Sequence, residues 1–157
     1  MTMKPVVLQL GEGEAIWQLG NRFTLKAAGE QTRGHFAILE QVCAGAPAPM
    51  HVHENEEETF YLLAGSIDLY VGDDVHGVDA GAFCLVPRGT PHTFITTSAE
   101  PARMLVIVSP PGFEQFFADV ERQFPEANGM PAAEDVGPGL TDIAAKYGCH
   151  MVGPPPK

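Results

Sequence analysis

The sequence predicts an all-β fold, a small β-barrel with one open mouth and one or two short helices at its C-terminal end. Three observations support this prediction. Short runs with the apolar/polar alternation of strands follow one another through the first two thirds of the chain. The 17 glycines and 14 prolines suit tight turns between such strands. A helical spacing of apolar residues appears only after residue 110.

The length and composition are those of one globular domain. A chain of 157 residues is long enough for one domain with a real core and short for two. We therefore expect a single domain over 1–157, with the barrel core over about 15–108 and the helical extension over about 112–148. Hydrophobic residues make up 45% of the chain, which excludes a disordered protein.

The net charge of the chain and its cysteines indicate which binding partners and which cellular compartment to expect. A formal net charge of -11 argues against nucleic acid and anionic membranes, since both attract a cationic surface. No run approaches the roughly 20 apolar residues of a membrane span. The three cysteines are scattered and odd in number, which favours free thiols in a reducing compartment. Without an apolar signal core at the start, we expect a cytoplasmic protein.

The strand-like runs follow one another with turn residues between them. A Gly-Asn step joins the first two runs as a hairpin turn, and the last run is apolar on both faces, as expected for a central strand. The expected strands are 15–19, 22–26, 35–42, 58–63, 67–71, 75–79, 81–86, 92–97 and 102–108.

The last third of the chain predicts helices. Apolar residues recur with helical spacing over 112–124, among them Phe113, Phe116 and Phe117, and this helix is expected to pack on the barrel near its mouth. We expect a loop over 130–139 and a second short helix over 140–147, capped by Thr141. Residues 153–157 are rich in proline and predict a stiff, exposed tail.

One stretch carries residues that bind metals. His51 and His53 lie two residues apart, so an extended strand points both imidazoles to the same face. A carboxylate, Glu58, follows after a short acidic segment in which we expect Glu54 and Glu56 to be solvated turn residues. Two imidazoles and a carboxylate are the ligands of a divalent transition metal.

The neighbouring Glu57 is the alternative to Glu58 as the carboxylate ligand. If Phe60 and Leu62 face the interior, alternation places Glu58 on their face and turns Glu57 outward. We therefore prefer Glu58, with Glu57 left open.

Two motifs together resemble the cupin family over about residues 33–108. The first motif combines a glycine, a His-x-His pair, a glutamate and a closing glycine at fixed spacing, met here by Gly45, His51, His53, Glu58 and Gly65. The second has a glycine, a Pro-x-Gly turn and a histidine, met here by Gly81, Pro87, Gly89 and His92. The asparagine that ends the family's second motif is replaced by Thr96.

The resemblance implies a double-stranded β-helix with four metal ligands, His51, His53, Glu58 and His92. Such a set suits one divalent ion of Fe, Mn, Ni, Co or Zn. The run 58–65 and the segment after Pro110 are similar to small one-domain cupins described as quercetin-dioxygenase-like. This similarity also points to a homodimer.

Three functions remain open for such a protein. The first is a metal-dependent dioxygenase that acts with dioxygen on a flavonol, a diketone or another enolisable or phenolic small molecule, with Glu58 as ligand and general base. The second is a metal-cupin isomerase, epimerase or decarboxylase. The third is a binding module that holds a metal and a small molecule without turnover.

Overall fold

The fold consists mainly of two antiparallel sheets. The computed structural model describes residues 3–126 and 133–157, and within them eleven strands form a six-stranded and a five-stranded sheet. This confirms the predicted all-β class. The strands are β1 (Glu14–Gln18), β2 (Asn21–Ala27), β3 (Ala37–Cys43), β4 (Met50–His53), β5 (Glu57–Ala64), β6 (Ser66–Val71), β7 (Asp74–Asp79), β8 (Phe83–Val86), β9 (His92–Thr96), β10 (Ala102–Ser109) and β11 (Cys149–Gly153).

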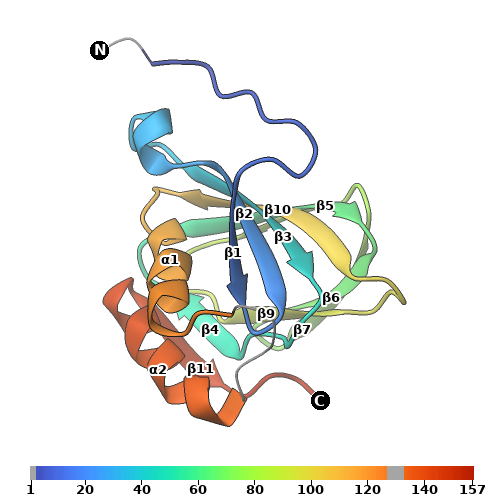
Figure 1. Cartoon of the computed structure of the whole chain (residues 1–157). Coiled ribbons are helices and arrows are strands. Elements are labelled where there is room, and N and C mark those ends of the chain that lie inside the picture. Colours follow the sequence, from blue (N-terminus) through green and yellow to red (C-terminus); the bar gives the residue numbers. More distant parts are fainter. Residues whose placement is uncertain (1–2, 127–132) are drawn as a thin grey trace.

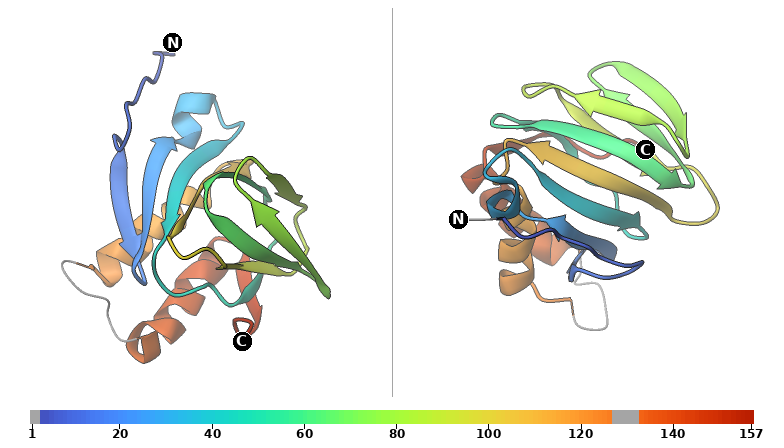
Figure 2. Two further views of the ribbon diagram at one scale, coloured as in Figure 1. Left: turned by 90° about the vertical axis from the view of Figure 1, so that its right-hand side faces the viewer. Right: turned by 90° about the horizontal axis from the view of Figure 1, so that it is seen from above.

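The two sheets enclose one core. The larger sheet has the order β1-β2-β3-β10-β5-β8 and the smaller one β11-β4-β9-β6-β7. Figures 1 and 2 show the strands around one interior, with the two helices together on the same side of them. Buried side chains of both sheets, such as Leu39 and Phe60 from one and Ile67 and Leu69 from the other, belong to the same cluster. The apolar area that these strands remove from water is the main stabilising contribution of the barrel.

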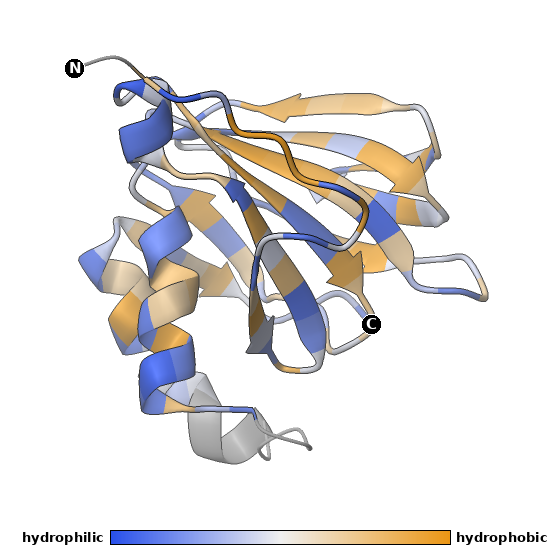
Figure 3. Ribbon diagram, turned by 45° about the horizontal axis from the view of Figure 1, so that its top comes forward, coloured by the Kyte–Doolittle hydropathy of each residue, from blue (hydrophilic) through white to orange (hydrophobic). Residues whose placement is uncertain are grey.

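Alternation along each strand decides what enters this core. In β10 the buried residues are Ala102, Met104, Val106 and Val108, and the residues between them are half-buried on the other face. β10 lies between β3 and β5, which confirms the prediction of a central strand. Alternating hydrophobic and hydrophilic residues are also visible along several strands in Figure 3.

The helix expected over 112–124 is present as α1 (Glu114–Gln123). Its apolar face buries Phe116, Phe117 and Val120, and the ring of Phe117 lies 4.1 Å from that of Phe23 in β2. The prediction that this helix packs on the barrel is confirmed. A single turn of 3-10 helix over Gly29–Thr32 was not expected from the sequence.

The second helix differs from the prediction. Helix α2 runs over Ala133–Lys146, so the loop expected over 130–139 is wrong for residues 133–139, while 130–132 lie outside the described residues. Packing explains the difference: Leu140, Ile143 and Ala144 are buried, which overrides the helix-breaking tendency of Pro138. Thr141 is not a cap, because it lies inside the helix and its hydroxyl donates to the Gly137 carbonyl at 3.1 Å.

Strand β11 was not predicted at all. It pairs with β4, with Cys149 opposite His53 and Met151 opposite His51. The smaller sheet therefore extends beyond the barrel core that the sequence predicted to end near residue 108. Only residues 154–157 form the exposed tail, since Gly153 is the last residue of β11.

Removal of residues 111–157 should destabilise the protein strongly. The truncation takes away α1, α2 and β11, uncovers Phe23 and leaves β4 as a sheet edge. We expect loss of the cooperative melting transition or a melting temperature lower by more than about 10 °C, since several buried apolar residues are lost. Circular dichroism during heating measures this.

The matched control for this truncation removes only residues 154–157, which lie beyond β11. That shorter protein should melt at the temperature of the full chain. An equal melting temperature for the 1–110 protein would mean that the C-terminal elements do not support the barrel.

Candidate metal centre

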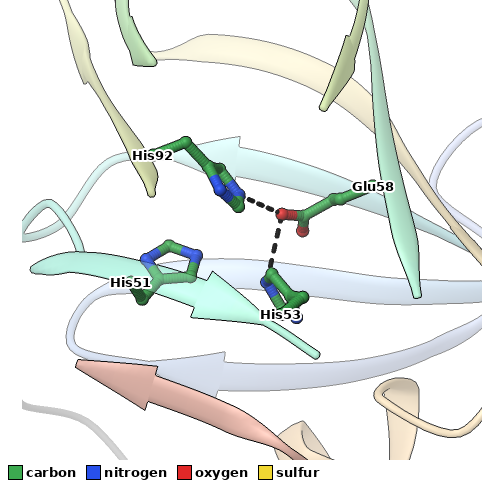
Figure 4. A group of neighbouring side chains, drawn as sticks. All are labelled: His51, His53, Glu58 and His92. Atoms are coloured by element: carbon green, nitrogen blue, oxygen red, sulfur yellow. Dashed lines mark hydrogen bonds and ion pairs between the residues drawn. The ribbon is translucent and has the colours of Figure 1, made fainter. Parts of the chain in front are cut away.

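The candidate site lies between the two sheets. His51 and His53 belong to β4 and His92 opens β9, which pairs with β4 so that His51 and His92 are direct partners. Glu58 comes from β5 in the other sheet. The four side chains point toward one another in Figure 4.

The segment that leads into β4 is held by Asn21 at the start of β2. The Gly45 amide donates to Asn21 Oδ1 at 3.0 Å, and Asn21 Nδ2 donates to the Ala46 carbonyl at 2.8 Å. A Cβ atom at Gly45 would lie 1.8 Å from the Leu19 carbonyl oxygen, so this close approach requires glycine. These contacts fix the position from which β4 presents its two histidines.

Glu58 is the centre of the cluster. Its Oε2 atom accepts a hydrogen bond from His92 Nε2 at 2.7 Å and lies 3.2 Å from His53 Nε2. One ligand atom from each of the four residues lies within 4.8 Å of all the others. This spread is close to the roughly 4 Å that separates opposite donors on one first-row divalent ion.

Each imidazole has a hydrogen bond at Nδ1, on the side away from Glu58. His51 Nδ1 donates to the Pro49 carbonyl at 2.7 Å, and His92 Nδ1 donates to the Thr90 carbonyl at 2.9 Å. His53 Nδ1 lies 2.5 Å from a carboxylate oxygen of Glu56. With Nδ1 occupied in all three rings, Nε2 is the nitrogen left for a metal.

The charges in the site are strongly coupled. Burial alone would raise the pKa of Glu58, but His53 and His92 hold it well below its usual range, so the carboxylate is ionised. Burial lowers the pKa of His53, yet the charge of Glu58 and the hydrogen bond to Glu56 outweigh burial and raise this pKa to about 10. Burial, followed by repulsion from His92, lowers the pKa of His51 to about 4.

Aromatic rings surround the imidazoles. Phe113, just before α1, meets His53 edge-on with the ring centroids 4.4 Å apart. Phe60 is buried beside His92 at 6.3 Å between centroids and also contacts Phe94. Such walls keep water from part of the site and strengthen its electrostatic interactions.

The site fits a divalent transition metal. His53 Nε2 is buried without a well-aligned hydrogen bond, although it lies near Glu58, and a buried nitrogen of this kind is costly unless it binds something. Three imidazoles and one carboxylate match the ligand preferences of Fe, Mn, Ni, Co and Zn. The structure brings together all four residues predicted from the sequence.

The structure also separates the acidic residues of this segment. Glu58 is buried together with Phe60 and Leu62, whereas Glu57 turns outward and forms two hydrogen bonds with Arg88, at 2.7 and 2.6 Å. The alternation argument for Glu58 therefore predicted the correct face.

The expectation that Glu56 is a solvated turn residue is wrong. Glu56 is 3% exposed and contacts His53. Sequence reasoning had a signal for it: Glu56 has the same parity as Glu58, Phe60 and Leu62, so an extended chain points it inward. The hydrogen bond to His53 gives the physical reason for its burial.

Fold and site together define a cupin. Residues 38–108 match the family model described as "Cupin domain", and this match includes all four residues of the site. The chain thus contains a cupin domain, as the motifs indicated.

Known relatives agree with this class. The chain is 30% identical over 114 residues to the quercetin 2,3-dioxygenase of Bacillus subtilis (strain 168), which covers 72% of this chain but only 34% of that protein. The chain therefore spans about a third of the length of this relative.

Two solved structures share the fold at low sequence identity. A protein from Planctomyces limnophilus has a TM-score of 0.58 at 18% identity, covering 69% of this chain and 91% of its own. Pac13, described as a unique nucleoside dehydratase, has a TM-score of 0.57 at 15% identity, covering 71% and 88%.

Replacement of His51 should abolish tight metal binding. His51 is half-buried and makes its hydrogen bond only to a backbone carbonyl, so His51→Ala should leave the fold intact. We expect about one equivalent of Fe, Mn, Ni, Co or Zn in the wild type after reconstitution, and less than about 0.1 equivalent in the variant. Elemental analysis of untagged protein measures this.

His76 in β7 supplies the matched control, because it is exposed and belongs to the opposite end of the smaller sheet. His76→Ala should keep the full metal content. A metal content in His51→Ala equal to that of this control would remove His51 from the ligand set.

Proposed function

We propose that the protein is a metal-dependent dioxygenase acting on an enolisable or phenolic small molecule such as a flavonol or a diketone. The observation that carries the proposal is the largely buried cluster of three imidazoles around one carboxylate, in a chain 30% identical over 114 residues to a quercetin 2,3-dioxygenase. His51, His53, Glu58 and His92 would hold one divalent ion. A bound divalent metal would supply Lewis acidity for a substrate oxygen, and a redox-active ion such as Fe or Mn would also supply an electron-transfer centre for dioxygen.

Glu58 is the group that can take a proton from the substrate. Its carboxylate is ionised beside His53 and His92, and a divalent cation held there would keep it so; it is also the only carboxylate among the four clustered residues. A hydroxyl or an acidic C–H that comes within hydrogen-bond reach of Glu58 can pass its proton to the carboxylate oxygen. Deprotonation leaves an electron-rich enolate or phenolate, which is the form that reacts with dioxygen.

The three imidazoles and the aromatic walls orient this chemistry. Each ring is fixed at Nδ1, so the direction of Nε2 is set before a substrate enters. Phe60 and Phe113 are buried against His92 and His53 and exclude water there. Exclusion of water protects a reactive anion from unwanted protonation.

Oxygen consumption with a panel of flavonols and diketones tests the function. We expect the reconstituted wild type to consume dioxygen with at least one of these compounds. Glu58→Gln should reduce the rate by about 100-fold or more, because the amide cannot accept the proton. Glu57→Gln is the control, since Glu57 lies outside the cluster with Arg88, and it should retain the wild-type rate.

Each contrary result has a definite meaning. Wild-type rates in Glu58→Gln would remove the base from the mechanism. Substrate turnover without oxygen consumption would point instead to an isomerase, epimerase or decarboxylase. Ligand binding to the reconstituted protein without turnover would indicate a binding module, and either result would contradict the dioxygenase.

We also propose that two copies of the chain associate through the outer face of β5 and β8. This face exposes large apolar side chains on two paired strands, and β8 is a sheet edge. Apolar surface of this kind favours burial against a second copy, and the area buried has to outweigh the repulsion between two chains that each carry a net charge of -11. The exposed residues are Tyr61, Leu63, Phe83 and Leu85.

Sedimentation velocity at micromolar concentration tests the homodimer. We expect a dimer for the wild type and a monomer for the double variant Phe83→Ser and Leu85→Ser, which removes apolar area from the face. Val75→Ser is the control, because Val75 is 53% exposed but belongs to β7 in the other sheet. A monomeric wild type would refute the association, and a dimeric double variant would refute this face.

A further inference from the structure

Glu56 occupies an unusual position for a glutamate in a surface turn. It is 3% exposed, although Glu54 is far more exposed and pairs with His150 at the surface, and Glu57 pairs with Arg88. Its Oε1 atom lies 2.5 Å from His53 Nδ1, the nitrogen that faces away from Glu58. Glu56 therefore contacts His53, one of the four clustered side chains, on the side of the ring opposite Glu58.

The three imidazoles differ in the group that accepts the hydrogen bond from Nδ1. His51 and His92 each use the carbonyl of the residue two positions before them, Pro49 and Thr90. His53 alone has a carboxylate there. A carbonyl fixes the orientation of a ring by its dipole, whereas a carboxylate adds a full negative charge and makes the opposite nitrogen a stronger donor.

Stability alone gives a poor reason to bury Glu56. Burial of a carboxylate is costly, and a buried ion pair often contributes less than a well-packed apolar pair would. The hydrogen bond that the structure records for the Glu56 side chain, within the part of the chain it describes, is the one to His53. The hydrogen bond of the Glu56 carboxylate is thus directed at the ring that contacts Glu58.

The charge balance of the centre changes when Glu56 is included. Three neutral imidazoles and Glu58 leave one positive charge on a divalent ion. Glu56 supplies the second negative charge through the ring of His53, so the buried centre as a whole becomes neutral. A neutral centre costs less to bury than a charged one.

We propose that Glu56 is a positioning residue for the metal centre. It fixes His53 with Nε2 toward Glu58 and strengthens this nitrogen as a metal donor by its negative charge. The inference rests on the proposed metal site. It adds a fifth residue to that site, one that would not touch the ion itself.

Metal affinity of Glu56 variants tests this role without depending on any substrate. The variants are Glu56→Gln, which keeps an acceptor but removes the charge, and Glu56→Ala, which removes both. Zn(II) and Co(II) affinities of the untagged full chain would be measured by competition with a chelator. We expect Glu56→Gln to bind about 10- to 100-fold more weakly than the wild type, and Glu56→Ala to bind at least as weakly.

Two further measurements separate positioning from a purely structural role. The visible absorption spectrum of the Co(II) protein reports the ligand field, and it should shift in Glu56→Gln because the His53 donor is weaker. The melting temperature without added metal should change little in Glu56→Gln, which conserves shape and an acceptor. The control is Glu54→Gln, whose carboxylate lies at the surface, and it should match the wild type in affinity and spectrum.

The outcomes are distinguishable. Wild-type affinity and spectrum in both Glu56 variants would overturn the role of Glu56 and leave the metal centre standing. A weaker affinity that follows a lowered melting temperature, with an unchanged Co(II) spectrum, would also overturn it in favour of a structural role. A wild type that binds neither ion would overturn the metal centre and the inference with it.

Discussion

The carboxylate of Glu58 joins the two sheets at the candidate site. It extends from β5 in the six-stranded sheet and meets His92 and His53 of the five-stranded sheet at 2.7 and 3.2 Å. A carboxylate buried in this way is tolerated only where its charge is matched. The charge of Glu58 is therefore matched only if β4 pairs with β9 and the alternation of β5 also turns Glu58 inward.

The C-terminal elements complete the wall around this contact. β11 covers the free edge of β4, the strand that carries two of the histidines, and the ring of Phe113 lies edge-on against His53. An unpaired β4 would expose backbone amides and carbonyls beside the site. The helical extension is consequently part of the environment of His53, although none of its residues that the structure describes contributes a ligand to the cluster. None of the helices that the structure describes is long and apolar enough to cross a membrane.

The sequence predicted what depends on local patterns and missed what depends on distant contacts. Alternation was enough to place Glu58 inside and Glu57 outside, and the resemblance to the two cupin motifs brought His92 together with His51 and His53. The second helix was misplaced because Gly137, Pro138 and Gly139 read locally as a loop, whereas burial of residues further along α2 decides the structure. β11 is short, and only its pairing with β4, far away in the sequence, makes it a strand.

Four glutamates between residues 54 and 58 show how position decides the role of one residue type. Glu54 meets His150 at the surface, Glu57 pairs with Arg88, and Glu56 and Glu58 turn inward onto opposite nitrogens of the same ring. Two inward carboxylates attract positive charge, and this attraction raises the pKa of His53 to about 10 even though burial opposes it. The charge can be supplied by a proton on His53 or by a divalent cation between Nε2 and Glu58, but not by both, because the proton occupies the nitrogen that a metal needs. The position between His53 Nε2 and Glu58, where the two carboxylates favour a proton, is therefore also the position where they most favour a divalent cation.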